Sequence, residues 1–208
     1  MMKIVGFDLD DTLVPEVLFI RSGIHAIAPE IHEKHPSIPT SRIINRMEAA
    51  VATRQNHYSA LESLFKEYSL SDSADMKDIV NDFRSHRPDP AIYHLAPSIQ
   101  EELDRLKNAG IRMILVTDGR SLTQRNKISA AALDRYFDDS DIYISEETGH
   151  DKTDPDTFLR IMERYAGASE FHFVGDNPDK DFIHPSRLGW KVHQVRRFPL
   201  MIHQGMPR

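Results

Sequence analysis

Three aspartates stand within four residues in the stretch VGFDLDDTLV, residues 5–14, directly after a short apolar run. Clustered carboxylates repel one another and are costly to remove from water. A divalent cation offsets this cost, and Mg²⁺ is a hard ion that binds carboxylates together with phosphate oxygens and water. Asp8 and Asp10 therefore predict a magnesium site that Asp176 completes, whereas Asp11 is most simply a turn residue.

The same residues supply most of the parts that phosphoryl transfer needs: a nucleophile, a metal, an acid, and donors around the phosphoryl oxygens. Asp8 can attack phosphorus and form an aspartyl phosphate. Asp10 can protonate the departing alcohol and later take a proton from the hydrolytic water. The candidates for binding the phosphate are Thr117, the backbone N–H groups of Asp118 and Gly119, and the ammonium of Lys152.

Strands and helices are predicted to alternate along the parts of the chain that carry these side chains. Apolar runs predict five buried parallel strands, at residues 3–8, 111–117, 141–146, 171–176 and 190–195. Helix starts are predicted at Ser98, at Ser121 with Gln124 as its capping partner, and at Asn177. The pattern predicts an α/β fold with a Rossmann-like parallel sheet and helices on both faces. Ligands bind at the carboxyl ends of such strands, so the site residues are expected to converge there.

The segment from 15 to 90 breaks this alternation. It predicts four amphipathic helices, at residues 16–33, 41–53, 57–69 and 73–86. We expect residues 15–90 to form a small all-helical cap domain, and residues 1–14 and 91–208 to form the α/β catalytic core. Basic and histidine side chains that could reach a substrate are Arg21, His25, Arg42, Arg46, Arg54 and His57 in the cap, and Arg120 and Arg125 in the core.

The composition of the chain argues against several classes of function. The net charge of −6 leaves no general basic field, so no nucleic-acid partner is expected. No apolar stretch reaches the roughly 18 residues of a membrane span, so no membrane partner is expected and the cytoplasm is the predicted compartment. The chain has no cysteine, which excludes thiolate catalysis and cysteine zinc sites. The oligomeric state is left open.

Four short motifs follow one another along the chain: FDLDDTL at 7–13, VTDG at 116–119, DKTDPDTF at 151–158 and VGDNPDKD at 174–181. Together they resemble the four ordered motifs of the haloacid dehalogenase-like (HAD) phosphohydrolase superfamily. The predicted helical segment stands where that superfamily carries a helical cap. One such motif alone is weak, but four in order, each at a strand end or a helix start, form a specific pattern.

The resemblance implies roles for the first motif. Asp8 would be the nucleophile and a magnesium ligand, and Asp10 would be the general acid and base whose backbone carbonyl also binds the ion. The dehalogenase members of the superfamily lack a carboxylate at the second position, because a halide leaving group needs no proton. Asp10 therefore favours a phosphatase.

For the later motifs, the resemblance makes Thr117 and Lys152 the phosphate binders and Asp176 a metal ligand. Asp181 would be an outer partner of Lys152 or of a metal-bound water. The sequence departs from the family pattern at Thr153, where a proline usually follows the lysine. The geometry of the loop at Lys152 is therefore open, although its charge is kept.

The expected function is that of a Mg²⁺-dependent phosphatase that hydrolyses a small phosphate monoester of a phosphorylated metabolite through an aspartyl phosphate. A phosphomutase of the same superfamily would use the same residues and is left open. A phospho-receiver signalling domain fits poorly, because its phosphoacceptor lies on a later strand than its acidic pair. A non-catalytic binding module is disfavoured, since all the expected polar positions are filled.

Overall fold

Five parallel strands form one sheet in the computed structural model of the chain, which describes residues 2–70 and 75–198. The strands are β1 (Met2–Phe7), β2 (Arg112–Thr117), β3 (Ile142–Ile144), β4 (Ala168–Gly175) and β5 (Lys191–Gln194). Their order is β3-β2-β1-β4-β5 and every pairing is parallel, which confirms the predicted α/β fold. β1 lies between β2 and β4, so the carboxyl ends of these three strands are neighbours.

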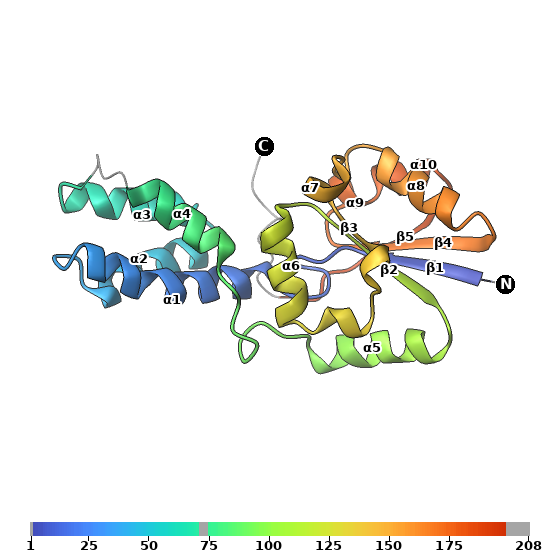
Figure 1. Cartoon of the computed structure of the whole chain (residues 1–208), viewed down its shortest axis with the longest axis horizontal. Coiled ribbons are helices and arrows are strands. Elements are labelled where there is room, and N and C mark those ends of the chain that lie inside the picture. Colours follow the sequence, from blue (N-terminus) through green and yellow to red (C-terminus); the bar gives the residue numbers. More distant parts are fainter. Residues whose placement is uncertain (1, 71–74, 199–208) are drawn as a thin grey trace.

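Helices connect the strands and build a separate group at one end of the molecule (Figure 1). They are α1 (Glu16–Lys34), α2 (Thr40–Ala52), α3 (His57–Glu67), α4 (Asp75–Ser85), α5 (Pro97–Asn108), α6 (Ser121–Ala130), α7 (Ser145–Thr148), α8 (Asp156–Arg164), α9 (Pro178–Asp181) and α10 (Ile183–Arg187), with 3₁₀ turns at Leu133–Arg135 and Asp139–Asp141. Within residues 2–70 and 75–198, no helix combines the length and the apolar character that crossing a membrane requires.

The sheet is covered on both faces, as the side-chain alternation of β2 shows. Successive residues of a strand point to opposite faces. Met113 and Leu115 belong to the buried cluster that includes α5, and Ile114 and Val116 belong to the cluster that includes α8. Accordingly, α5 lies on one side of the sheet and α8 on the other (Figure 1). Two covered faces explain why the strands are nearly continuous apolar runs in the sequence.

Helices α1–α4 pack together beyond the carboxyl ends of the strands (Figure 1). Each begins and ends within about two residues of its predicted bounds, the usual uncertainty of helix ends; residues 73 and 74 of the fourth predicted helix lie outside the described residues. The buried cluster that contains Phe7 and Leu115 continues through Val17 and Phe19 into this helical block. The division into a core and a cap stays a prediction, and residues 199–208 of the predicted core also lie outside the described residues.

Two predicted helix caps are wrong, by two residues for α5 and by one residue for α6. α5 begins at Pro97, not after Ser98, because the fixed φ of proline suits the first helical position. α6 begins at Ser121 itself, and Ser121 does not act as the cap. Its N–H donates to a carboxylate oxygen of Glu146 at 2.7 Å and its hydroxyl to Glu147 at 2.5 Å. Acidic side chains from α7 therefore satisfy this helix terminus, where negative charge is favourable.

The packing of α1 against α4 depends on a glycine. A Cβ atom at Gly23 would lie 2.6 Å from Cε2 of the Phe83 ring. We expect Gly23→Ala to lower the free energy of unfolding by about 1 kcal/mol, because overpacking costs ~1–3 kcal/mol and exceeds the ~1 kcal/mol gain in helix propensity. Urea denaturation measures this change.

Gly167→Ala is the matched control for Gly23→Ala. No heavy atom lies within 4 Å of a Cβ atom built at Gly167, and its φ is not positive. We expect this variant to be as stable as the parent protein or slightly more stable. Equal stability of both variants and the parent would contradict the close contact between α1 and Phe83.

Candidate active site

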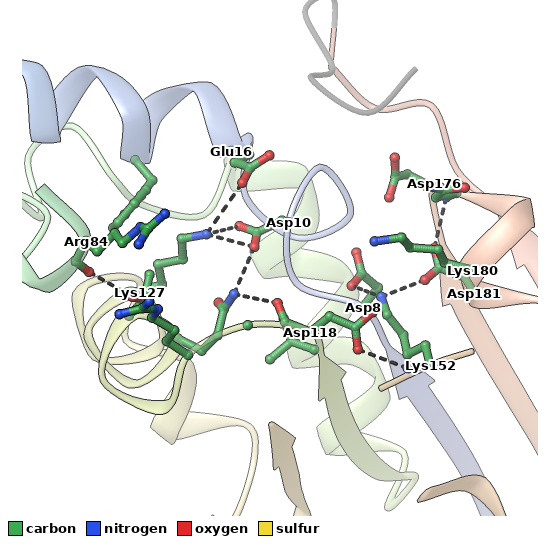
Figure 2. A pocket seen from close by; sticks show the side chains of 17 residues that line it. Asp8, Asp10, Glu16, Arg84, Asp118, Lys127, Lys152, Asp176, Lys180 and Asp181 are labelled. Carbon is green, nitrogen blue, oxygen red and sulfur yellow. Dashed lines mark hydrogen bonds and ion pairs between the residues drawn. The ribbon is translucent and has the colours of Figure 1, made fainter. Parts of the chain in front are cut away.

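A cavity of about 320 Å³ lies at the carboxyl ends of β1, β2 and β4 (Figure 2). All eight residues predicted for the site line it: Asp8, Asp10, Thr117, Asp118, Gly119, Lys152, Asp176 and Asp181. They come from four separate stretches of the chain. The structure thus brings these eight residues together.

Lys152 is the centre of the first of two charged groups in this cavity (Figure 2). Its ammonium lies 2.5 Å from Oδ1 of Asp8 and 2.6 Å from Oδ1 of Asp181. Thr12 donates its hydroxyl to the other oxygen of Asp8 at 2.9 Å. Burial raises the pKa of Asp8 to about 8, although Lys152 opposes this shift. Burial acts to lower the pKa of Lys152, but the carboxylates of Asp8 and Asp181 outweigh it and that pKa is raised.

The first group also contains an acidic cluster. One carboxylate oxygen from each of Asp8, Asp176 and Asp181 lies within 4.8 Å of the others, and all three residues are buried. Lys152 is the buried ammonium of this group and pairs with two of the three carboxylates, Asp8 and Asp181, so negative charge is in excess. Carboxylate oxygens are the ligands that Mg²⁺ prefers, and this donor set therefore fits a magnesium ion.

Asp10 belongs to a second charged group, beside the first (Figure 2). Both of its carboxylate oxygens lie 2.8 Å from the ammonium of Lys127. Gln124 donates to Asp10 at 3.3 Å and to the backbone carbonyl of Asp118 at 2.9 Å. Glu16 lies 4.0 Å from the same ammonium. The carboxylate of Asp10 therefore does not belong to the acidic cluster. The three members of that cluster are Asp8, Asp176 and Asp181.

Lys127 was not singled out in the sequence, and Gln124 only as a capping partner. Both lie on α6, which begins just after the turn at Asp118 and Gly119. Residues three apart share a helix face, so this spacing directs Gln124 and Lys127 to the same side. Lys127 is 2% exposed, and its ammonium lies 4.5 Å from the centroid of the Phe19 ring. Burial acts to lower the pKa of Lys127, but Asp10 and Glu16 outweigh it and the pKa is raised.

The turn after β2 has structural contacts of its own. The carboxylate of Asp118 accepts a hydrogen bond from the backbone N–H of Lys152 at 3.0 Å. The N–H of Gly119 donates to Oγ of Ser145 at 2.9 Å. In this structure the Gly119 donor is therefore directed to β3 and α7, and its predicted contact with phosphate stays a prediction. Asp118 contributes through its carboxylate as well as through its backbone, because it holds the loop that carries Lys152.

Thr153 replaces the proline of the family pattern, and the loop is fixed by hydrogen bonds instead. The Thr153 N–H and hydroxyl donate to Oδ1 of Asp151 at 2.8 and 2.5 Å. Its carbonyl lies 2.7 Å from Nε2 of His184. These contacts hold the backbone next to Lys152 without the fixed φ that proline would supply.

The predicted basic side chains are divided among several places. Arg120 lines the active-site cavity, together with Arg84 and Lys180, which the sequence did not suggest. Arg21 pairs with Glu48, whereas Arg42 and Arg46 both pair with Glu67. Arg125 pairs with Glu147 at 2.7 Å and also with Asp139. Arg54 and His57 line a neighbouring cavity.

Comparison with known proteins places the chain in a family. The sequence profile of the haloacid dehalogenase-like hydrolases matches residues 2–183. A glyceraldehyde 3-phosphate phosphatase from Methanopyrus kandleri is 26% identical, with 95% of this chain and 85% of the relative covered. A phosphoserine phosphatase from Thermus thermophilus is also 26% identical, with 86% and 83% covered.

A solved structure shows the same fold. The magnesium-bound HAD-hydrolase YfnB from Bacillus subtilis superposes with a TM-score of 0.64 at 22% identity, covering 93% of this chain and 88% of that one. The profile match extends over most of the chain and includes the ends of β1, β2 and β4, where the cavity lies. The chain therefore belongs to the haloacid dehalogenase-like hydrolases.

Proposed function

We propose that this enzyme is a Mg²⁺-dependent phosphatase that hydrolyses a small phosphate monoester through an aspartyl phosphate on Asp8. The observation that carries the proposal is the position of Asp8, which contacts the ammonium of Lys152 and lies in one cluster with the carboxylates of Asp176 and Asp181, with Asp10 in the same cavity. The phosphatase names of the two relatives support the reaction class.

Asp8 carries the first step. One of its carboxylate oxygens attacks phosphorus, the bond between phosphorus and the ester oxygen breaks, and the leaving alkoxide takes a proton from Asp10. Lys152 lies against Asp8 and places a positive charge where the phosphoryl oxygens would lie. Thr117, buried in the same cavity wall, is the proposed hydroxyl donor to the phosphoryl group.

Water completes the reaction. Asp10 takes a proton from water, the water oxygen attacks phosphorus, and the bond between phosphorus and Asp8 breaks to release inorganic phosphate. This step needs the charged form of Asp10, which the loss of its proton in the first step leaves. The first step needs a protonated Asp10, so its carboxylate must leave Lys127 and turn toward the ester oxygen before the alcohol departs.

Asp8, Asp176 and the backbone carbonyl of Asp10 are the proposed magnesium ligands. Asp181 lies within the same cluster, and we propose that it holds Lys152. When bound, Mg²⁺ supplies charge that offsets the carboxylates and the phosphate, and it lowers the raised pKa of Asp8 so that the nucleophile is ionised.

The helical block is proposed to act as a cap over this cavity. Glu16 and Phe19 of α1 and Arg84 of α4 line the cavity together with residues of the sheet. Cap domains exclude water and select the leaving group, and residues 15–90 would have this role against the core of 1–14 and 91–208. The substrate would be a small phosphorylated metabolite, and the site of action the cytoplasm.

Loss of the nucleophile tests the proposal. We expect Asp8→Asn to lower kcat by at least about 10³-fold, because an amide cannot form the aspartyl phosphate. Phosphate release from a panel of monoesters measures this. Removal of Mg²⁺ with EDTA should abolish turnover of the parent enzyme, and added Mg²⁺ should restore it.

Asp11→Asn is the matched control in the same loop. Asp11 has a φ of 59° and its carboxylate accepts from the N–H of Glu16 at 2.9 Å, both of which asparagine can reproduce. We expect activity within a few fold of the parent. Full turnover by Asp8→Asn would overturn the assignment of Asp8 as the nucleophile. Formation of an isomeric ester without release of inorganic phosphate would indicate a mutase.

The position of Asp181 depends on a glycine at the end of β4. A Cβ atom at Gly175 would lie 2.4 Å from Oδ2 of Asp181. We expect Gly175→Ala to displace this carboxylate from Lys152 and lower kcat by about 10–100-fold, the usual effect of losing such a supporting contact. Steady-state kinetics measure the loss. Gly167→Ala is the control, and parent-like kinetics for Gly175→Ala would contradict the role given to Asp181.

Lys127 is a positioning residue for Asp10 in this proposal. We expect Lys127→Met to lower kcat by about 10-fold or more with little change in KM, because Lys127 orients the acid and base group and not the phosphate. Lys66→Met, on the exposed side of α3, is the matched control and should keep the parent kinetics. A change in KM alone would instead place Lys127 in substrate binding.

A further inference from the structure

A second cavity, of about 250 Å³, lies beside the active site within the helical block. Glu16 and Phe19 line both cavities, so the two share a wall. The rest of its lining comes from α1, α2, α3 and α4 and from the loop between α2 and α3: Ile20, Val51, Arg54, Gln55, Asn56, His57, Tyr58 and Phe83.

Aromatic rings form much of this lining. The Phe83 ring lies 5.3 Å from that of Tyr58 and 6.1 Å from that of Phe19, in both cases edge to face. The His57 ring lies 5.1 Å from Phe83. Such rings prefer offset or edge-to-face contacts with another ring, so a planar aromatic group gains specific contacts here that a saturated group of similar size does not.

The second cavity lies on the side of the active site that holds Asp10, the proposed acid for the leaving group. The Phe19 ring is 4.5 Å from the ammonium of Lys127, which holds Asp10. Arg84 lines the active site, and its guanidinium carbon lies 5.6 Å from the centroid of the Tyr58 ring. Asp10 is the group that protonates the leaving oxygen, so an alcohol attached to this oxygen extends toward Phe19 and the second cavity.

His57 supplies a polar group for this cavity. Its Nε2 atom is buried and has no hydrogen-bond partner among the described residues. Buried polar atoms in folded proteins are usually paired, and this nitrogen would gain a partner if the His57 ring turned toward a ligand in the cavity. The cavity therefore combines aromatic walls with a hydrogen-bonding nitrogen, a combination suited to a heteroaromatic ring.

We propose that this second cavity is the leaving-group subsite, and that the preferred substrates are phosphomonoesters of alcohols that carry a planar aromatic or heteroaromatic ring. This inference rests on the proposed phosphatase function. A cavity of about 150 Å³ already holds benzene, so 250 Å³ accommodates one ring with a short linker. A leaving group of three carbons would leave most of the aromatic surface without contacts.

Three esters of primary alcohols test the inference, because similar leaving oxygens keep the chemical step comparable. They are ethyl phosphate, 2-cyclohexylethyl phosphate and 2-phenylethyl phosphate, assayed by phosphate release with Mg²⁺. We expect kcat/KM for the phenyl ester to exceed that of the ethyl ester by at least about 10-fold and that of the cyclohexyl ester by several fold. In the parent enzyme, kcat/KM for a 2-(pyridin-4-yl)ethyl ester should equal or exceed that for the phenyl ester. In His57→Leu, kcat/KM for the pyridyl ester should fall below that for the phenyl ester.

Tyr58→Leu removes one aromatic wall, and Tyr68→Leu is the matched control. Tyr68 follows the last residue of α3 and is not part of the cavity lining. In the parent enzyme the kcat/KM of the phenyl ester divided by that of the ethyl ester is expected to be high. We expect Tyr58→Leu to lower this ratio until it is close to the kcat/KM of the cyclohexyl ester divided by that of the ethyl ester. Tyr68→Leu should keep the parent ratio. Circular dichroism would establish that both variants are folded.

The outcomes separate the two proposals. Hydrolysis of all three esters with equal kcat/KM would overturn the subsite and leave the phosphatase function intact. An equal reduction of the ratio in Tyr58→Leu and Tyr68→Leu would also overturn the subsite, since the preference would not come from this wall. Failure to release phosphate from any ester, with Mg²⁺ present, would overturn the phosphatase function and the subsite with it.

Discussion

The site depends on the compensation of buried negative charge. Asp8, Asp176 and Asp181 are almost completely inaccessible to solvent, and an isolated carboxylate in such surroundings would be protonated or would destabilise the fold. The ammonium of Lys152 neutralises part of this charge and leaves an excess. Burial raises the pKa of Asp8, and a divalent cation would balance the same carboxylates, so the proposed metal site and the proposed nucleophile depend on one electrostatic arrangement.

The parallel sheet makes this arrangement possible. β1 is paired with β2 and with β4, so Asp8, Thr117 and Asp176 follow adjacent strands although they are far apart in the sequence. The two covered faces anchor the strands through apolar side chains such as Leu115 and Val116. The site residues lie at the strand ends, where the loops add Lys152 and the helical block adds the remaining wall.

Local chemistry explains which features could be predicted from the sequence. Apolar runs fix the strands, and Asn177 before a proline fixes a helix start, where its side chain accepts from the N–H of Asp179. The eight residues that line the cavity were predictable because each belongs to a short motif at a strand end or a helix start. The partner of Asp10 could not be predicted, because Lys127 lies 117 residues away in the sequence and reaches Asp10 only through the packing of α6. The aromatic cavity likewise requires the tertiary contacts of four helices.

α6 connects two parts of the protein that have different tasks. Gln124 and Lys127 hold Asp10, whereas Thr123 and Asn126 donate hydrogen bonds to the carbonyls of Arg84 and Ser85 at the end of α4. One short helix thus contacts both the proposed acid and base, Asp10, and the helical block. If Asp10 and the helical block have the proposed roles, a change that re-orients α6 will alter turnover and substrate choice together, so these two properties cannot diverge independently through this element.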